Sequence, residues 1–165
     1  MNQSLAKAVN STGRIFQINV SDGGVPKTPL RAAEVGLFGL RGDRQRDTEH
    51  HGGLERAVCL YSLERILALQ AEGHPIYPGA VGENVTVSGL DWDQVVPGAR
   101  LWLGEAVAIE ITGYAAPCRH IQASFAGQQF GRISAKNHPG WARAYARVLR
   151  PGPIAIGDEI RLGDE

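Results

Sequence analysis

Residues 101–111 read Leu-Trp-Leu-Gly-Glu-Ala-Val-Ala-Ile-Glu-Ile, and this stretch points to the class of fold. Residues 101–103 and 107–111 are short apolar runs of the kind found in strands. Gly104-Glu105 between them suits the tight turn of a β-hairpin. Similar short runs recur along the chain, separated by glycine and proline. The sequence is therefore predicted to be mainly β.

Further strands are expected on both sides of this hairpin. Residues 14–20 alternate around Ile and Val, and residues 35–38 end in a glycine-rich turn. Residues 57–61, Ala-Val-Cys-Leu-Tyr, form the continuous apolar run of a strand buried on both faces. Residues 84–87 resume the strand pattern, and residues 157–163 resemble the glycine turn and strand that start at Gly98.

Helices are expected at two places. Ser62 is well placed as the N-cap of a helix that continues to about Glu72, where Gly73 stops it. Residues 139–149 carry apolar side chains at helical spacing, which indicates a second short helix. Six or more strands with a few short peripheral helices predict a closed or nearly closed β-barrel, because an open sheet of this size exposes its edges.

Composition restricts the partners and the location that we expect. The chain has 165 residues and a formal net charge of zero, so it lacks the net positive field that attracts nucleic acids and anionic membranes. Any anion site must then be local. No apolar stretch approaches the ~20 residues that span a bilayer, and residues 1–13 lack a signal-peptide core, so a cytoplasmic location is expected. One domain is expected over residues 1–165, with its core at about 14–162 and a flexible segment at 1–13.

The two cysteines have different surroundings. Cys59 lies inside an apolar strand and is interpreted as a packing residue. Cys118 lies in Pro117-Cys-Arg-His120 after a strand, where Arg119 and His120 favour a thiolate. A thiolate is both the reactive form and the form that binds a soft metal. The alternative is a small apolar filler at a strand end, and the residues alone leave both interpretations open.

A polar loop before residues 57–61 is a second place for function. It reads Asp43-Arg-Gln-Arg-Asp-Thr-Glu-His-His-Gly-Gly53. Glycines at 52 and 53 expose backbone N–H groups, and Arg56 is placed to supplement them in holding an anion. A solvated loop with salt bridges is the simpler alternative. A metal-dependent hydrolase built on Asp43, Asp47, His50 and His51 is the weakest hypothesis, because adjacent histidines seldom bind one ion.

Several separated motifs, taken in order, resemble the MOSC domain, which occurs at the C-terminus of molybdenum cofactor sulfurases and in free-standing bacterial proteins of the YiiM type. The resemblance spans about residues 14–162. It is carried by Lys27 in Gly24-Val-Pro-Lys-Thr-Pro29, Gly42-Asp43-x-Gln45-x-Asp47, His51-Gly52-Gly53-x-x-Arg56-Ala57-Val58, Gly82-Glu83-Asn84-Val-Thr86, Pro117-Cys118 and Gly157-Asp158-x-Ile160.

The resemblance implies a MOSC-type β-barrel of mixed strands that binds the molybdenum cofactor, a pterin dithiolene with a terminal phosphate. On one hypothesis Cys118 ligates molybdenum. The protein is then an oxidoreductase that reduces N-hydroxylated small molecules with electrons from a separate flavin or iron–sulfur reductase. On the other hypothesis Cys118 carries sulfur as a persulfide, and the protein is a non-catalytic sulfur or cofactor carrier that meets a sulfur donor or acceptor protein. Pyridoxal phosphate is not expected, because the sequence has no counterpart of the sulfurases' desulfurase domain.

The resemblance also assigns residues. Cys118 is the implied metal ligand, and Arg119 and His120 accompany it as catalytic residues, with Arg119 tuning the thiolate. The implied cofactor-binding residues are Lys27, Asp43, His51, Gly52, Gly53, Arg56, Glu83 and Asn84, of which Lys27 and Arg56 are expected to contact phosphate or pterin. A single site requires Cys118 and the loop at His51 to lie close together.

Overall fold

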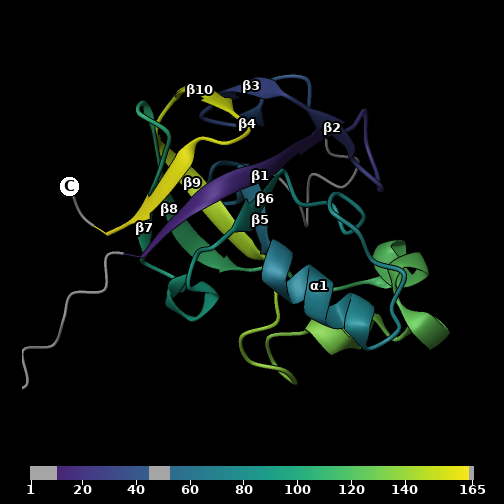
Figure 1. The fold of residues 1–165 in the computed structure, drawn as a ribbon. Coiled ribbons are helices and arrows are strands. Elements are labelled where there is room, and N and C mark those ends of the chain that lie inside the picture. The colour runs from purple at the N-terminus through teal and green to yellow at the C-terminus, as the bar shows by residue number, and fades with distance from the viewer. Residues whose placement is uncertain (1–10, 45–52, 164–165) are drawn as a thin grey trace, which may run out of the picture.

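The computed structural model describes residues 11–44 and 53–163 (Figure 1). Strands dominate it, as predicted, and helices are short. In chain order the elements are β1 (Thr12–Val20), β2 (Thr28–Leu30), β3 (Ala32–Gly36), β4 (Gly39–Leu40), η1 (Leu54–Arg56), β5 (Val58–Ser62), α1 (Leu63–Ala71), β6 (Val85–Ser88), η2 (Trp92–Gln94), β7 (Arg100–Leu103), β8 (Val107–Tyr114), η3 (Arg119–Ser124), η4 (Ala126–Gln128), η5 (Phe130–Ile133), β9 (Ala144–Arg150), β10 (Gly152–Ala155) and β11 (Glu159–Leu162), where η denotes a 3-10 helix.

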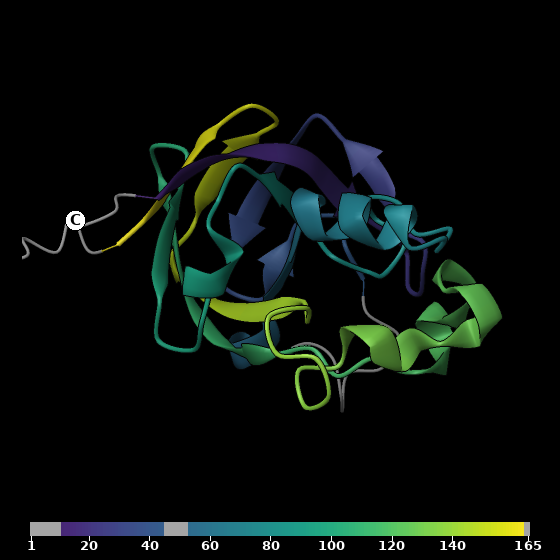
Figure 2. The same cartoon turned by 60° about the horizontal axis from the view of Figure 1, so that its bottom comes forward.

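Within the described residues, strands close into a ring in the order β1, β6, β5, β9, β8, β7, β11 and back to β1. Figure 2 shows this ring of strands, with α1 and the green 3-10 helices η3 to η5 outside it. Neighbouring strands of the ring are antiparallel except β5 and β6, which are parallel. The predicted closed barrel of mixed strands is confirmed. Outside the ring, β2 pairs with β1, and β10, β3 and β4 form a small second sheet.

A β-bulge in β1 changes which of its residues face the core. The register of β1 against β6 shifts between Ile15 and Gln17. Ile15 and Ile18 are three residues apart, yet both belong to the buried core of the barrel. The extra residue therefore reverses the alternation of faces along the rest of β1. Asn19 follows Ile18 and is buried, with its side-chain amide donating to the Glu83 carbonyl at 3.1 Å.

The predicted helix after residues 57–61 is confirmed as α1, which connects the parallel strands β5 and β6. Ser62 caps it, because its hydroxyl accepts a hydrogen bond from the Arg65 amide at 3.2 Å. Ile66 and Leu69 on one face of the helix are buried. A crossover helix is the usual way to join two parallel neighbours in one sheet.

The prediction of a helix over residues 139–149 is wrong, because this stretch contains most of strand β9. The apolar residues that suggested helical spacing also alternate, and Ala144, Ala146 and Val148 face the barrel core. Tyr145 lies on the other face, against Cys59. β9 is hydrogen-bonded to β5 on one side and β8 on the other. Tertiary pairing therefore overrides a short helical pattern.

The sequence reasoning did not predict the three 3-10 helices between residues 119 and 133. They lie on the same side of the barrel as α1 in both views (Figures 1 and 2). Arg132 pairs with Glu72 at 2.9 Å, and the Ala126 amide donates to His74 Nδ1 at 3.0 Å, which ties this segment to the end of α1. Among residues 11–44 and 53–163, no helix is both long and apolar enough to cross a membrane.

The packing of α1 predicts opposite outcomes for two adjacent residues. Ile66 is fully buried, so Ile66→Ala is expected to lower the free energy of unfolding by about 2–5 kcal/mol. Leu67 is 51% exposed, so Leu67→Ala is the matched control and is expected to change it by less than about 0.5 kcal/mol. Urea denaturation followed by circular dichroism measures both. Equal losses in the two variants would contradict this packing of the helix.

Candidate functional site

A pocket of about 290 Å³ lies where several loops meet beside β5 and β9. Four of the predicted site residues line it: Lys27, Asn84, Cys118 and His120. The described residues that line it are Gly23, Gly24, Val25, Lys27, Arg44, Cys59, Val81, Gly82, Asn84, Cys118, His120, Ile121, Arg143 and Tyr145. Residues far apart in the sequence are therefore brought together around one cavity.

One wall of the pocket rests on a buried ion pair. Lys27 Nζ lies 2.6 Å from Asp43 Oδ1, with the two side chains only 8% and 6% exposed. The other carboxylate oxygen, Asp43 Oδ2, accepts from Asn84 Nδ2 at 2.9 Å. The Ser21 amide also donates to Oδ1, at 3.0 Å. Such additional hydrogen bonds are what a buried ion pair needs to be stable. Asp43 thus orients Lys27 and Asn84, and Lys27 presents a compensated charge to the pocket.

Asn84 is a scaffold residue of this wall. Its backbone and side chain both bind Cys59 in β5: the Asn84 amide donates to the Cys59 carbonyl at 2.7 Å, and Asn84 Oδ1 accepts from the Cys59 amide at 3.0 Å. A side chain that satisfies a backbone N–H in this way fixes the loop on the strand. Asn84 therefore connects the Lys27–Asp43 pair to the barrel.

Gly79 explains how the Lys27 loop packs so closely. The Lys27 amide donates to the Gly79 carbonyl at 2.9 Å. Gly79 has φ +89°, and a Cβ atom there would lie 2.7 Å from the Lys27 carbonyl oxygen. Only glycine allows both the backbone conformation and the approach. The pocket-facing position of Lys27 thus depends on a residue with no side chain.

Cys118 is half-buried and lines the pocket just after β8. It directly precedes η3, in extended backbone conformation. His120 is exposed and also lines the pocket, whereas Arg119 is exposed and does not line it. Of the predicted catalytic residues Cys118, Arg119 and His120, the first and the last therefore line the pocket.

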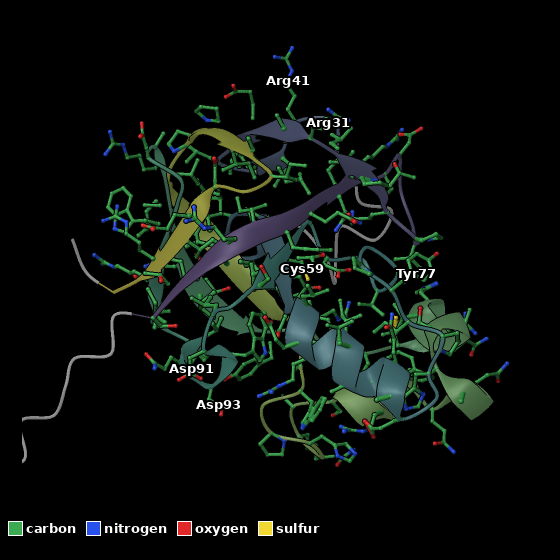
Figure 3. All side chains as sticks on the ribbon, in the orientation of Figure 1. Arg31, Arg41, Cys59, Tyr77, Asp91 and Asp93 are labelled. Atoms are coloured by element: carbon green, nitrogen blue, oxygen red, sulfur yellow. The ribbon has the colours of Figure 1, made fainter. Side chains whose placement is uncertain are left out.

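Cys59 is buried against Ala115 and Tyr145, as its interpretation as a packing residue predicted. Figure 3 shows it in the middle of the molecule, whereas Arg41 points outward from the upper edge. Burial raises the pKa of the Cys59 thiol to about 11, although the Arg143 charge opposes the rise. Cys59 also lines the pocket, which the sequence did not indicate. The pocket thus has two cysteines, of which Cys59 stays a thiol at neutral pH.

Arg143 is a pocket residue that the sequence reasoning missed. It immediately precedes β9 and is only 5% exposed. Its Nη1 donates to the Val81 carbonyl at 2.6 Å, and its Nη2 to the Ala116 carbonyl at 3.5 Å. In the sequence Arg143 stands between Ala142 and Ala144 in a stretch predicted to be helical, and nothing in that pattern indicates that it is buried.

The lining of the pocket is cationic. It contains Lys27, Arg44 and Arg143, and none of the described residues that line it is acidic. Asp43 balances Lys27 from behind the wall, whereas Arg143 makes no ion pair with any residue that the structure describes. The chain as a whole has no net charge, so this charge is a local feature. The expectation of a local anion site stays a prediction.

Other predicted residues lie away from the lining. Arg56 is exposed, and its guanidinium lies over the Tyr145 ring at 5.6 Å, so one aromatic residue separates it from the pocket. Gly53 is exposed at the start of η1 and does not line the pocket. His51 and Gly52, as well as Asp47 and His50 of the hydrolase hypothesis, lie outside the described residues. The question of one shared site with the His51 loop is therefore untested.

Glu83 is fully buried beside Asn84 in the sequence and does not line the pocket. The Thr86 hydroxyl donates to its Oε2 at 3.1 Å. Burial raises the pKa of the Glu83 carboxyl to about 7, with hydrogen bonds and the Arg143 charge opposing the rise. Glu83 therefore belongs to the support of the pocket, where it is partly protonated near neutral pH.

The sequence profile of the MOSC domain matches residues 47–161. The uncharacterized protein YflK of Bacillus subtilis is 31% identical over 142 residues, which cover 84% of this chain and 62% of YflK. A protein named Reductase from Gibberella moniliformis is 32% identical over 129 residues, which cover 75% of this chain and 22% of that protein. The chain thus spans less than two thirds of the length of these relatives.

A solved structure has the same fold. The crystal structure of YiiM from Geobacillus stearothermophilus superimposes with a TM-score of 0.71 at 26% identity, over 92% of this chain and 75% of that one.

The burial of Glu83 predicts how stability depends on pH. The Glu83 carboxyl loses its proton at its usual pKa of 4.5 in the unfolded chain and at a pKa of about 7 in the native protein. Between these two values the native protein binds more protons, so the free energy of unfolding falls as pH rises through this window and then levels off. The shift corresponds to about 3 kcal/mol. Glu83→Gln is expected to remove this loss. Urea denaturation of both proteins from pH 4.5 to 8 measures the difference, and parallel pH profiles would contradict the prediction.

Proposed function

Because the chain belongs to the MOSC domain family, we propose that its pocket binds the molybdenum cofactor and that Cys118 ligates the molybdenum. The proposed activity is the reduction of N-hydroxylated small molecules in the cytoplasm, with electrons from a separate flavin or iron–sulfur reductase. The observation that supports it most is the position of Cys118, which lines the same pocket as Lys27 and Asn84. The resemblance of the sequence had linked these three residues to one cofactor.

The residues of the pocket fit this cofactor. A half-exposed thiol is the soft ligand that molybdenum takes, and Cys118 is the cysteine that offers one. Lys27 and Arg143 supply positive charge for the phosphate or pterin oxygens, and among residues 11–44 and 53–163 no acidic side chain lines the pocket to repel them. Asn84 and Asp43 would act indirectly, because their polar atoms are occupied by each other, by Lys27 and by backbone.

The side chains also suit the proton requirements of the reaction. Reduction of an N–OH group to N–H consumes two electrons and two protons and releases water. When bound, the cofactor supplies the electron-transfer chemistry. His120 is exposed and lines the pocket, so its imidazole can pass protons from solvent to a bound substrate. Tyr145 also lines the pocket, and it keeps its proton because burial raises the pKa of the phenol.

The name of the relative from Gibberella moniliformis supports an oxidoreductase. That protein is called Reductase, and the matched segment covers 22% of it. The activity proposed for the present chain therefore rests mainly on its own pocket and on its family, with the name as secondary support.

Molybdenum content tests the role of Cys118. In protein made in a host that synthesises the cofactor, Cys118→Ser is expected to lose the stoichiometric molybdenum of the wild type, because the metal loses its protein sulfur ligand. Cys59→Ala is the matched control, since Cys59 lines the same pocket as a buried thiol, and it is expected to keep the metal. Elemental analysis by mass spectrometry measures all three proteins.

Two results would contradict the proposal. One is wild-type protein without molybdenum that carries cyanide-labile sulfur on Cys118, which would favour a sulfur carrier. The other is equal molybdenum content in Cys118→Ser and the wild type, which would remove Cys118 from the metal site.

A further inference from the structure

Arg143 lacks a counter-ion that its burial calls for. It is only 5% exposed, and no carboxylate among the described residues lies within ion-pair distance of it. A buried charge is costly unless it is paired and hydrogen-bonded. The Val81 and Ala116 carbonyls accept from its two terminal nitrogens, but Nε has no partner in the described part of the chain. A guanidinium has five N–H donors, so several stay available.

Arg147 in β9 provides a comparison. It lies four residues after Arg143, which immediately precedes this strand, and it pairs with both Glu110 and Glu55 at the surface. Arg143 is far more buried and has no such partner. Glu83 is the buried carboxyl that influences it, yet Glu83 lies beyond ion-pair distance, and its raised pKa of about 7 leaves it only partly charged at neutral pH.

The surroundings of Arg143 fit a negatively charged ligand. It lines a pocket that also has Lys27 and Arg44 in its lining, and the lining residues that the structure describes include no acidic one. The Lys27 charge is already met by Asp43 at 2.6 Å, so Arg143 is the buried cation of this pocket whose charge is left uncompensated among the described residues. Arginine binds carboxylate and phosphate oxygens well, because its planar donors match two oxygens at once.

We propose that Arg143 forms an oxyanion-binding subsite of this pocket and takes a carboxylate or phosphate group of the ligand that binds there. This deepens the proposed function, on which the identity of the ligand rests, because it assigns one buried residue to the anionic group of that ligand. Two sources share this chemistry: the terminal phosphate of a cofactor, and an anionic group on a substrate.

Titration of cofactor-free protein tests the subsite. Protein made in a host unable to synthesise the cofactor is titrated with sodium phosphate and with sodium acetate at constant ionic strength, and calorimetry gives the dissociation constants. Arg143→Gln is expected to bind the better probe roughly tenfold to a hundredfold more weakly than the wild type. Arg147→Gln is the matched control four residues further along the chain and is expected to bind it as the wild type does.

A second measurement uses the wild type alone, in case Arg143→Gln does not fold. Bound oxyanion is expected to slow the alkylation of Cys118 by neutral iodoacetamide, with half-protection at the measured dissociation constant, because both residues line the pocket. Absence of binding and of protection, or equal affinity in Arg143→Gln and the wild type, would overturn the proposal.

Cofactor-loaded protein then identifies the source of the oxyanion. If the cofactor phosphate occupies Arg143, the loaded protein no longer binds the probe, and if a substrate anion does, the loaded protein still binds it. Either result supports the subsite. The first titration needs no molybdenum, so failure of the subsite is distinguishable from failure of the proposed function.

Discussion

The carboxylate of Asp43 joins three segments of the chain that form one wall of the pocket. It accepts from Lys27, from Asn84 and from the Ser21 amide, with its side chain almost fully buried. Removal of any partner leaves a buried charge or a buried donor unsatisfied, and both are costly. Arg143 also joins two segments of the chain, because it donates to the carbonyls of Val81 and Ala116. Two buried charged residues thus hold the loops that surround Cys118, and the barrel supplies the rigid frame beneath them.

Strands and helices were predictable where the sequence pattern is compatible with only one kind of secondary structure. Residues 101–111 contain a hairpin turn and two apolar runs, and Ser62 carries the side chain that a helix N-cap needs; both appear as expected. The prediction for residues 139–149 was wrong because small apolar residues there satisfy a helical and an alternating pattern at once. Pairing with β5 and β8 decided between the two, and a sequence pattern does not contain that information.

The site was predictable in part. The resemblance to a family had assigned Lys27, Asn84 and Cys118 to cofactor binding, and all three line the pocket. The same reasoning did not predict that Asp43 acts by holding Lys27. It also missed Arg143, because an arginine between alanines reads as a surface residue until the fold shows that it is buried without a carboxylate. The functional meaning of a charged residue depends on its partners, and partners distant in sequence become visible only in three dimensions.

The pairing of β1 with β11 has a consequence for chain connectivity. Thr12 lies opposite Arg161, so the first and the last strand of the described chain are neighbours in the ring. The described lining residues of the pocket, in contrast, fall between positions 23 and 145. Closing the barrel thus brings together strands separated by almost the whole chain, at a cost in loop entropy. A circular permutant that links β11 to β1 and opens the β7–β8 turn retains each strand of the ring and each lining residue. In that permutant the pairing of β1 with β11 becomes local in sequence. The pairing of β7 with β8 becomes the long-range one, and neither of these two strands contributes a residue to the pocket lining.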